Sequence, residues 1–248
     1  MRYISACSFG KDSMAGILLA LEHGEPLDEA VYCEVMFDRN ISGEVPEHRD
    51  FIYERGIPFL ERNGIKVTVL HSQMTFIESF YSACKKGTAK GMLHGWPLCG
   101  KCCIQRDCKL KPIQTYRKTL GQDVVQYLGI AKDEPERLAR LDGITTVSLL
   151  DQYGLTEKAA AALCRRAELY SPVYAFAPRN GCFFCPNAKK VELRHLYDHH
   201  PDLWARLLEC QRAPNKATEL FNRTQRFDEI DANFRFDDRQ FSLFQETA

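Results

Sequence analysis

The spacing of apolar residues divides the first half of the chain into alternating strands and helices. Short apolar runs of the kind found in strands occupy residues 3–7, 30–37, 66–70 and 124–129. Between them, apolar residues recur at helical spacing over 12–23, 46–62 and 76–84, and Gly24 ends the first of these helices. Because strands that alternate with helices are typical of a parallel sheet, the pattern predicts an α/β fold with helices on both faces of that sheet.

The second half has a different pattern, since no further strand is evident after Val147. Helices are predicted over residues 156–168, with Thr156 as the N-cap, and over 189–199, 201–211 and roughly 214–227. The polar tail from Asp228 carries four phenylalanine rings, through which we expect it to dock. We therefore predict an α/β part over residues 1–145 and a helical part over residues 146–248 that contributes cysteines.

The composition is that of a soluble globular protein. Of the 248 residues, 45% are hydrophobic and 27% are charged. A chain of this length can bury a sizeable core. Lys plus Arg and Asp plus Glu both number 33, so a basic coat for nucleic acid is not indicated, although a local basic patch would still allow such binding. No apolar run approaches the roughly 20 residues that span a bilayer. Residues 1–5 lead directly into a strand pattern, so we expect no signal peptide, no membrane contact and a cytoplasmic location.

A short polar loop joins the first predicted strand to the first helix. It reads Ser8-Phe9-Gly10-Lys11-Asp12-Ser13. A helix N-terminus attracts anions, Gly10 lets the backbone approach a phosphate, and Lys11, Ser8 and Ser13 add donors. Ligands of α/β folds gather at the carboxyl ends of strands, so we favour a phosphate site over a simple capped turn. Asp12 is then expected to cap the helix or to hold a metal ion.

The cysteines point to metal or redox chemistry. They number 11, and without a secretion signal an odd set of this size is not read as a disulfide framework. Cys182 and Cys185 lie two apart on a glycine-containing turn, where both sulfurs can face one metal. Two of four upstream thiols would complete the ligands: Cys99, Cys102, Cys103 and Cys108. The others fall in strand or helix patterns and are expected to pack as small hydrophobes: Cys7, Cys33, Cys84 and Cys164.

The loop resembles the pyrophosphate loop Ser-Gly-Gly-x-Asp-Ser of the adenine-nucleotide α-hydrolase (PP-loop) superfamily, with Phe9 in place of its first Gly. Further segments are similar to those of phosphoadenylyl-sulfate (PAPS) reductases: Phe37-Asp38 with Glu44-Val45-Pro46-Glu47, Lys109-Leu110-Lys111-Pro112-Ile113, Gly129-Ile130-Ala131-Lys132-Asp133-Glu134 and Gly181-Cys182-Phe183-Phe184-Cys185-Pro186. The resemblance spans roughly residues 3–205. It implies an adenine nucleotide such as ATP, PAPS or adenylyl sulfate (APS) as ligand, held by Ser8, Gly10, Lys11, Asp12, Ser13 and Asp38.

Basic residues near the segment 129–134 are implied to hold the sulfate or phosphate of that ligand. These are Lys132, Arg137 and Arg140. Arg137 and Arg140 lie three apart and share one helix face, which suits an anion but equally suits a solvated basic face.

The adjacent pair Cys102-Cys103, followed at a distance by Cys-x-x-Cys, resembles the [4Fe–4S] pattern of APS reductases. The resemblance implies a cluster whose ligands come from Cys99, Cys102, Cys103, Cys182 and Cys185. The alternative is a structural Zn²⁺ site built from the two Cys-x-x-Cys pairs, since Zn²⁺ accepts four thiolates as readily.

Reductases of this family carry a Glu-Cys-Gly-x-His segment whose cysteine attacks sulfur. The candidate here, Glu209-Cys210-Gln211-Arg212, lies in a helical pattern and lacks the Gly and His, so we expect Cys210 to pack rather than react. Three hypotheses follow. The first is a PAPS or APS reductase-like enzyme, for which a thiol donor protein is a candidate partner. The second is an ATP-dependent sulfur-transfer or nucleic-acid-modifying enzyme, as related PP-loop proteins are. The third is a Zn-stabilised interaction module, which the intact loop disfavours.

The histidines contribute little to this picture. His199 and His200 precede Pro201, as at a helix junction of the family, and are expected to form a surface cap rather than to bind a ligand.

Overall fold

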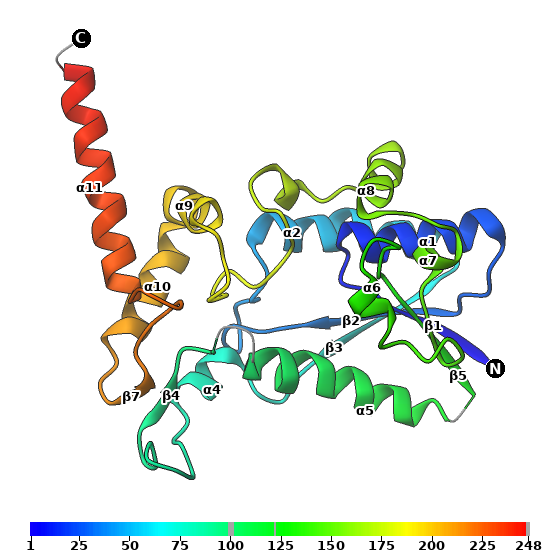
Figure 1. The fold of residues 1–248 in the computed structure, drawn as a ribbon, viewed down its shortest axis with the longest axis horizontal. Helices are drawn as coiled ribbons and strands as arrows, with labels where there is room; N and C mark the ends of the chain where they lie inside the picture. The colour runs from blue at the N-terminus through cyan, green and yellow to red at the C-terminus, as the bar shows by residue number, and fades with distance from the viewer. Residues whose placement is uncertain (99–101, 122, 247–248) are drawn as a thin grey trace.

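A parallel five-stranded sheet forms the centre of the first half of the molecule (Figure 1). The computed structural model describes residues 1–98, 102–121 and 123–246. The strand order is β3-β2-β1-β5-β6, and every pairing is parallel. The strands are β1 (Arg2–Ala6), β2 (Glu29–Glu34), β3 (Lys66–His71), β5 (Val124–Leu128) and β6 (Thr146–Val147). The expected α/β class is thereby confirmed.

Helices cover both faces of the sheet because its side chains alternate in direction. On one face, Tyr32 and Tyr127 join the apolar cluster around α1, which also contains residues of α2, α3, α7 and α8. On the other face, Ile4, Val31 and Val124 meet α5. The helices of this half are α1 (Lys11–His23), α2 (Pro46–Phe51), η1 (Ile52–Gly56), α3 (Ile57–Arg62), η2 (Gln105–Leu110), α5 (Lys111–Thr119), α6 (Pro135–Leu138), α7 (Leu149–Gln152) and α8 (Glu157–Arg166).

The strand order reverses at β1, which lies between β2 and β5. The chain runs from β1 to β2 and β3 on one side and then returns to β5 on the other. A crevice opens at the carboxyl ends of strands at such a switch point. Ala6 pairs with Leu128, so the ends of β1 and β5 lie side by side. The loop 8–13 therefore starts at the place where this fold class binds ligands.

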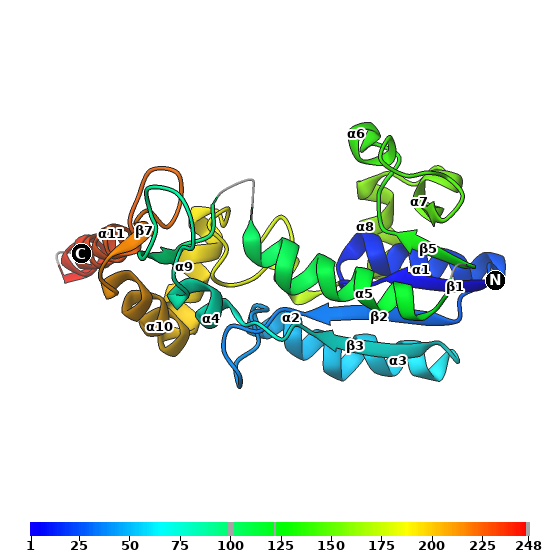
Figure 2. The same cartoon turned by 90° about the horizontal axis from the view of Figure 1, so that it is seen from below.

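The second part of the molecule lies beyond the carboxyl ends of β2 and β3 (Figure 2). Its apolar cluster is rich in aromatic rings, with Phe76 stacked on Phe184 at 4.1 Å between centroids and Trp204 against Phe227 at 4.4 Å. Its elements are α4 (Phe76–Tyr81), β4 (Leu93–Gly95), η3 (Pro172–Ala175), α9 (Lys190–His199), α10 (Pro201–Arg212), β7 (Lys216–Thr218) and α11 (Phe227–Glu246).

The predicted helix over residues 214–227 is wrong. Asn215 has a φ of 52° and turns the chain, and β7 then pairs with β4, although no strand was expected here. The Lys216 ammonium is buried and donates to the carbonyls of Gln211 and Ala213, so it caps the end of α10 instead of continuing a helix. The polar tail forms the helix α11 and docks through Phe234, whose side chain is buried, whereas Phe236 is exposed.

The other C-terminal helices agree with the pattern. Thr156 is the N-cap of α8, because its hydroxyl accepts the Ala159 N–H at 3.3 Å. The division at residues 145/146 stays a prediction, since α7 and α8 follow it in sequence but belong to the apolar cluster around α1. Within the described part of the chain, no helix is long and apolar enough to cross a membrane.

Candidate functional site

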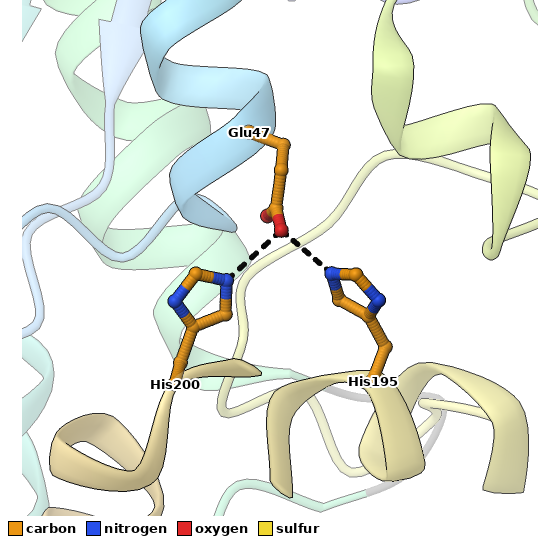
Figure 3. Close-up of side chains that lie close together, drawn as sticks. All are labelled: Glu47, His195 and His200. Carbon is orange, nitrogen blue, oxygen red and sulfur yellow. Dashed lines mark hydrogen bonds and ion pairs between the residues drawn. The ribbon is translucent and has the colours of Figure 1, made fainter. Parts of the chain in front are cut away.

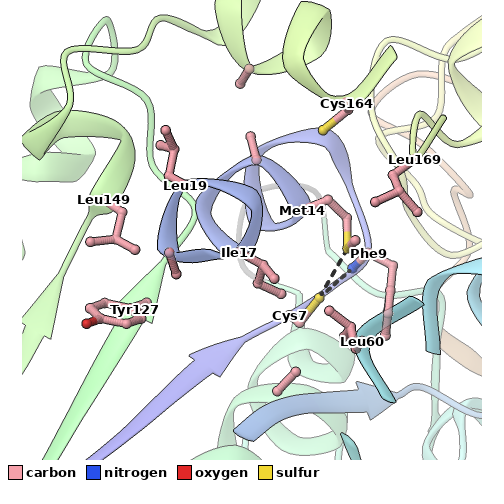
Figure 4. Close-up of a cluster of buried hydrophobic side chains, with 14 of the residues drawn as sticks. Cys7, Phe9, Met14, Ile17, Leu19, Leu60, Tyr127, Leu149, Cys164 and Leu169 are labelled. Atoms are coloured by element: carbon pink, nitrogen blue, oxygen red, sulfur yellow. Dashed lines mark hydrogen bonds between the residues drawn. The ribbon is translucent and has the colours of Figure 1, made fainter. Parts of the chain in front are cut away.

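The loop after β1 contains a residue in the left-handed backbone region. Phe9 has a φ of 55°, a conformation that favours glycine. Its ring is buried beside Met14 and Leu60 in the apolar cluster around α1 (Figure 4). Gly56 makes room for this ring, because a Cβ there would lie 2.5 Å from Phe9 Cδ1. Burial of the ring thus offsets the strain at the position where the superfamily motif has Gly.

Hydrogen bonds hold the rest of the loop in a closed turn. The Ser13 hydroxyl donates to the Gly10 carbonyl at 3.0 Å and accepts the Ser8 N–H at 3.3 Å. Gly10 is the N-cap of α1, and no side chain caps this helix. The expectation that Asp12 caps α1 is therefore wrong: its carboxylate accepts the Lys11 ammonium at 2.8 Å.

The Ser8 carbonyl is fixed by two side chains from distant parts of the sequence. It accepts from His48 Nε2 at 3.1 Å and from Asn180 Nδ2 at 3.2 Å. Since a carbonyl only accepts, Nε2 carries the proton, and His48 Nδ1 accepts the Ser171 hydroxyl at 2.8 Å. His48 is fully buried, and burial lowers its pKa, so the ring is neutral. The loop is thus held by α2 and by the segment before the Cys-x-x-Cys turn.

The first turn of α1 is held from the same side. Tyr174 accepts the Lys11 N–H at 2.9 Å. A Cβ on Gly10 would lie 2.8 Å from Asn180 Oδ1 and 3.0 Å from the Tyr174 hydroxyl. A glycine is therefore needed at position 10 for this close approach.

A cavity of about 510 Å³ opens over the loop at the switch point of the sheet. All five loop residues predicted to bind nucleotide line it, and the ends of β1 and β5 form its floor. The structure therefore brings Ser8, Gly10, Lys11, Asp12 and Ser13 together around one space.

Three further cations line this cavity, namely Lys109, Arg137 and Arg179. Arg137 is paired with Glu134, and Arg179 donates to Cys185 Sγ at 3.3 Å. The Lys109 ammonium makes neither an ion pair nor a hydrogen bond to any other residue that the structure describes. Its half-buried ammonium is thus the cation with most capacity left for an anion.

The Lys11 ammonium is already engaged. It lies 2.8 Å from Asp12 and 3.2 Å from Glu157. Burial alone would lower the pKa of Lys11, but these two carboxylates raise it above its usual value. Burial raises the pKa of Asp12, and the Lys11 charge only partly offsets this. An incoming phosphate would compete with both carboxylates for Lys11.

Three predicted binding residues lie away from the cavity. Asp38 accepts the backbone N–H groups of Asn40 and Ile41 at 2.8 Å and pairs with Arg206 at 3.0 Å, so it organises its own turn. Lys132 and Arg140 are exposed and do not line the cavity. Arg137 is thus the one residue of the predicted basic set that the structure brings to the loop.

A second cavity, of about 240 Å³, adjoins the first and contains thiols. Cys102, Cys182 and Cys185 line it. Cys99 lies outside the described residues, and Cys103 is half-buried next to Cys102 without lining the cavity. The two cavities share four lining residues: Ser8, Lys109, Arg179 and Asn180.

Local backbone contacts position the two sources of thiols. The Phe183 N–H donates to the Gly43 carbonyl at 2.9 Å, which joins the Cys-x-x-Cys turn to the segment after β2. A Cβ on Gly43 would lie 2.6 Å from the Val35 carbonyl oxygen, so this approach requires glycine. Cys102 lies one turn before η2, and its sulfur accepts the Gln105 N–H at 3.4 Å.

Burial favours the neutral thiol form of Cys182 and Cys102. Burial raises the pKa of Cys182 well above its usual value, and Glu44, Cys185 and Cys102 raise it further. Burial also raises the pKa of Cys102. Burial alone would lower the pKa of Arg179, but its contact with Cys185 raises it. A bound metal would deprotonate such thiols.

The remaining described cysteines are mostly packing residues. Cys7, Cys33 and Cys164 are buried as expected, whereas Cys84 is half-exposed. Cys108, an open candidate for the ligand set, is fully buried away from the thiol cavity and donates to the Met74 carbonyl at 3.2 Å. Burial raises the pKa of Cys108 to about 11.

Four residues of the site were not identified from the sequence: His48, Lys109, Arg179 and Asn180. Lys109 and Asn180 do lie in the segments quoted for the family resemblance or next to them, but position in a motif does not show which side chains face the loop. His48 follows Pro46-Glu47 at the start of a helix, where a buried imidazole has no signal in the pattern of apolar residues.

No family model matches this chain, and no curated protein matches its sequence. Among solved structures, the chain is similar to the U34-tRNA thiolase NcsA from Methanococcus maripaludis with its [4Fe–4S] cluster. The TM-score is 0.44 at 16% sequence identity, over 86% of this chain and 71% of that chain. What this chain does must therefore be inferred from its own residues.

Proposed function

We propose that this chain is an ATP-dependent sulfur-transfer enzyme of the pyrophosphate-loop type, with a thiolate-held iron–sulfur cluster next to its nucleotide site. The observation that carries the proposal is that the loop cavity and the thiol cavity share Ser8, Lys109, Arg179 and Asn180. A phosphate at the loop and a sulfur species at the thiols would then be neighbours. Transfer between the two requires that proximity.

The loop residues would hold the phosphates. The N-terminus of α1 is directed at the cavity, Gly10 leaves the backbone accessible, and Ser8 adds a hydroxyl. Lys109 supplies a cation on the side that faces the thiols. His48 and Asn180 hold the Ser8 carbonyl and so keep the loop in this shape before the ligand arrives.

The thiols fit a cluster better than a single zinc ion. Four sulfurs around one Zn²⁺ lie about 3.8 Å apart, given Zn–S bonds of about 2.3 Å. Among the described residues, no three cysteine sulfurs lie within 4.8 Å of one another. Cys102, Cys182 and Cys185 would hold the cluster, with Cys99 or Cys103 as the fourth candidate. When bound, it would supply sulfide beside the phosphates.

The reaction balances with sulfide as co-reactant. An acceptor carbonyl oxygen, for example an oxo group of a nucleobase, bonds to the α-phosphorus of ATP as pyrophosphate leaves. Sulfide then forms the new carbon–sulfur bond, and AMP departs with the original oxygen. The net change is ATP, sulfide and a C=O group to AMP, pyrophosphate and a C=S group. Lys109 would stabilise the charge that develops on the phosphates.

The reductase alternative is less well supported. It requires a mobile, accessible thiolate to attack the sulfur of PAPS or APS. Cys210 is 1% exposed within α10, and burial raises its pKa to about 12. It lies outside both cavities.

Substitution of Lys109 tests the nucleotide site. We expect Lys109→Ala to weaken ATP binding about 10- to 100-fold, because a charge-assisted hydrogen bond contributes roughly 1.5–3 kcal/mol. Lys111→Ala is the matched control, because Lys111 is exposed and lines neither cavity. Calorimetric titration with ATP measures both variants. Equal ATP affinity in Lys109→Ala and the parent would remove Lys109 from the site.

The reaction itself is tested by its products. We expect AMP and pyrophosphate when the cluster-loaded protein receives ATP, sulfide and unfractionated tRNA or DNA, with a thionucleoside found by mass spectrometry. We expect no sulfite from PAPS or APS with thioredoxin, and Cys210→Ala should behave as the parent. Sulfite release that Cys210→Ala abolishes would establish the reductase instead.

A further inference from the structure

Two histidines and a glutamate converge at the junction of the two parts of the molecule (Figure 3). Glu47 Oε1 lies 2.6 Å from His195 Nε2 and 3.0 Å from His200 Nε2. Glu47 belongs to α2, His195 to α9, and His200 lies between α9 and α10. Within the described part of the chain, these are the only three His, Cys, Asp or Glu residues whose ligand atoms all lie within 4.8 Å of one another.

The second carboxylate oxygen supplies an independent observation. Glu47 Oε2 is buried, and among the described residues it is the only buried side-chain nitrogen or oxygen without a hydrogen-bond partner. Leaving such an atom unsatisfied costs free energy, and for a charged group the cost is larger. One oxygen of this carboxylate therefore has two donors, while the other has none.

Ring contacts hold one of the two imidazoles in position. Phe176 stacks on the His195 ring at 3.5 Å between centroids, and His199 stacks on it at 4.3 Å. At least one imidazole of the group is thus oriented in advance.

We propose that Glu47, His195 and His200 bind a divalent transition-metal ion. Two imidazoles and one carboxylate are the ligands that Zn²⁺ and Fe²⁺ take in proteins, and three ligands leave a position open for water. The ion would replace the two Nε2 protons and satisfy the carboxylate. Its ligands come from α2 and from the α9–α10 junction, so the ion links the two parts of the molecule.

The expectation that the two histidines before Pro201 form a surface cap is wrong for His200. His200 is the N-cap of α10 by position, but its side chain makes no capping hydrogen bond. It points toward Glu47 instead (Figure 3). His199 does remain on the helix surface, where its Nδ1 contacts the His195 carbonyl at 3.0 Å.

Cobalt tests this site separately from the thiols. Co²⁺ bound to nitrogen and oxygen gives visible d–d bands, and Co²⁺ bound to thiolate adds a strong near-ultraviolet charge-transfer band. We expect anaerobic titration of the cluster-loaded, full-length protein with CoCl₂ to show one ion per chain without the thiolate band. Glu47→Gln should weaken this binding at least about 100-fold, since even loss of a second-shell partner costs roughly 10- to 100-fold. His94→Gln, at a distant exposed histidine, should bind as the parent.

A second variant and a second measurement distinguish the loss of a metal ligand from misfolding of the variant. His200→Gln removes a ligand from a position that makes no capping hydrogen bond, and circular dichroism of each variant without metal reports its fold. We expect ZnCl₂ to raise the melting temperature of the parent and of His94→Gln, but of neither ligand variant. The proposal is overturned if the parent binds Co²⁺ through thiolate alone, or if a folded Glu47→Gln or His200→Gln protein binds it as the parent does.

Discussion

Replacing Cys182 or Cys185 with serine is expected to remove the iron of the purified protein and to lower its melting temperature in the same step. Both thiols line the cavity that adjoins the loop, and a serine hydroxyl is a poor ligand for an iron–sulfur cluster. Metal binding is coupled to folding, so the two losses should appear together. Iron analysis and the visible absorption of anaerobically purified protein measure the first, and thermal melting measures the second. The parent should contain about four irons per chain.

Thiols outside the cavity provide the controls for this result. Cys164→Ala and Cys84→Ala should both retain the iron, because neither sulfur lines the thiol cavity. Cys164 is buried next to α1 and Cys84 is half-exposed, so the two controls include one buried cysteine and one partly exposed cysteine. Full iron content in Cys185→Ser would contradict the assignment. Stoichiometric zinc without colour in the parent would replace the cluster with the zinc alternative.

The fold could be predicted from the sequence where one local pattern decides it. The apolar runs at 30–37 and 124–129 are buried on both faces, so they became central parallel strands. The prediction for the region after α10 failed because β7 pairs there with β4, a strand that lies far away in the sequence. The Lys216 ammonium is buried against the last carbonyls of α10, and a lysine gives no such signal in a hydropathy pattern.

The candidate site likewise has a part that the local sequence predicts and a part that depends on distant contacts. The loop 8–13 was predictable because its residues are consecutive and their place between strand and helix is decided locally. Lys109 and Asn180 are about 100 and 170 residues away from it. They reach the loop only because β5 returns to the side of β1 and because the segment before Cys182 packs over α1. Asp38 is the opposite case: the motif predicts that it lies near the nucleotide, whereas in the structure its own turn and Arg206 satisfy its carboxylate.

The three-residue group around Glu47 had no sequence signal at all. Glu47 is about 150 residues away from the two histidines, and each member of the group has an ordinary local explanation. Glu47 is in the first turn of a helix, where acidic residues are common, and His200 precedes a proline at a helix start. Only the fold, which brings His195 and His200 to Glu47, shows that their ligand atoms meet.

Replacing Gly129 with alanine is expected to abolish nucleotide binding while leaving most of the fold intact. Gly129 follows β5 at the floor of the loop cavity. A Cβ there would lie 2.6 Å from Ser13 N and 2.7 Å from the Asp12 carbonyl carbon. Both are backbone atoms of the first turn of α1, so the clash cannot be relieved by rotating a side chain. We expect a loss of stability of about 1–3 kcal/mol, as for other overpacked sites.

Gly16→Ala separates displacement of the loop from a general effect of alanine near α1. Gly16 lies on the same helix, but a Cβ there meets only Leu150 Cδ1, at 3.3 Å, and a leucine methyl can shift. Alanine in a helix interior also gains about 0.5–1 kcal/mol over glycine. This variant should therefore bind ATP as the parent and melt at or above its temperature. If Gly129→Ala bound ATP within about threefold of the parent, less than 1 kcal/mol, the first turn of α1 would not form the phosphate site. Loss of ATP binding in Gly129→Ala, with ATP binding retained in Gly16→Ala, would place the phosphates between the end of β5 and the N-terminus of α1.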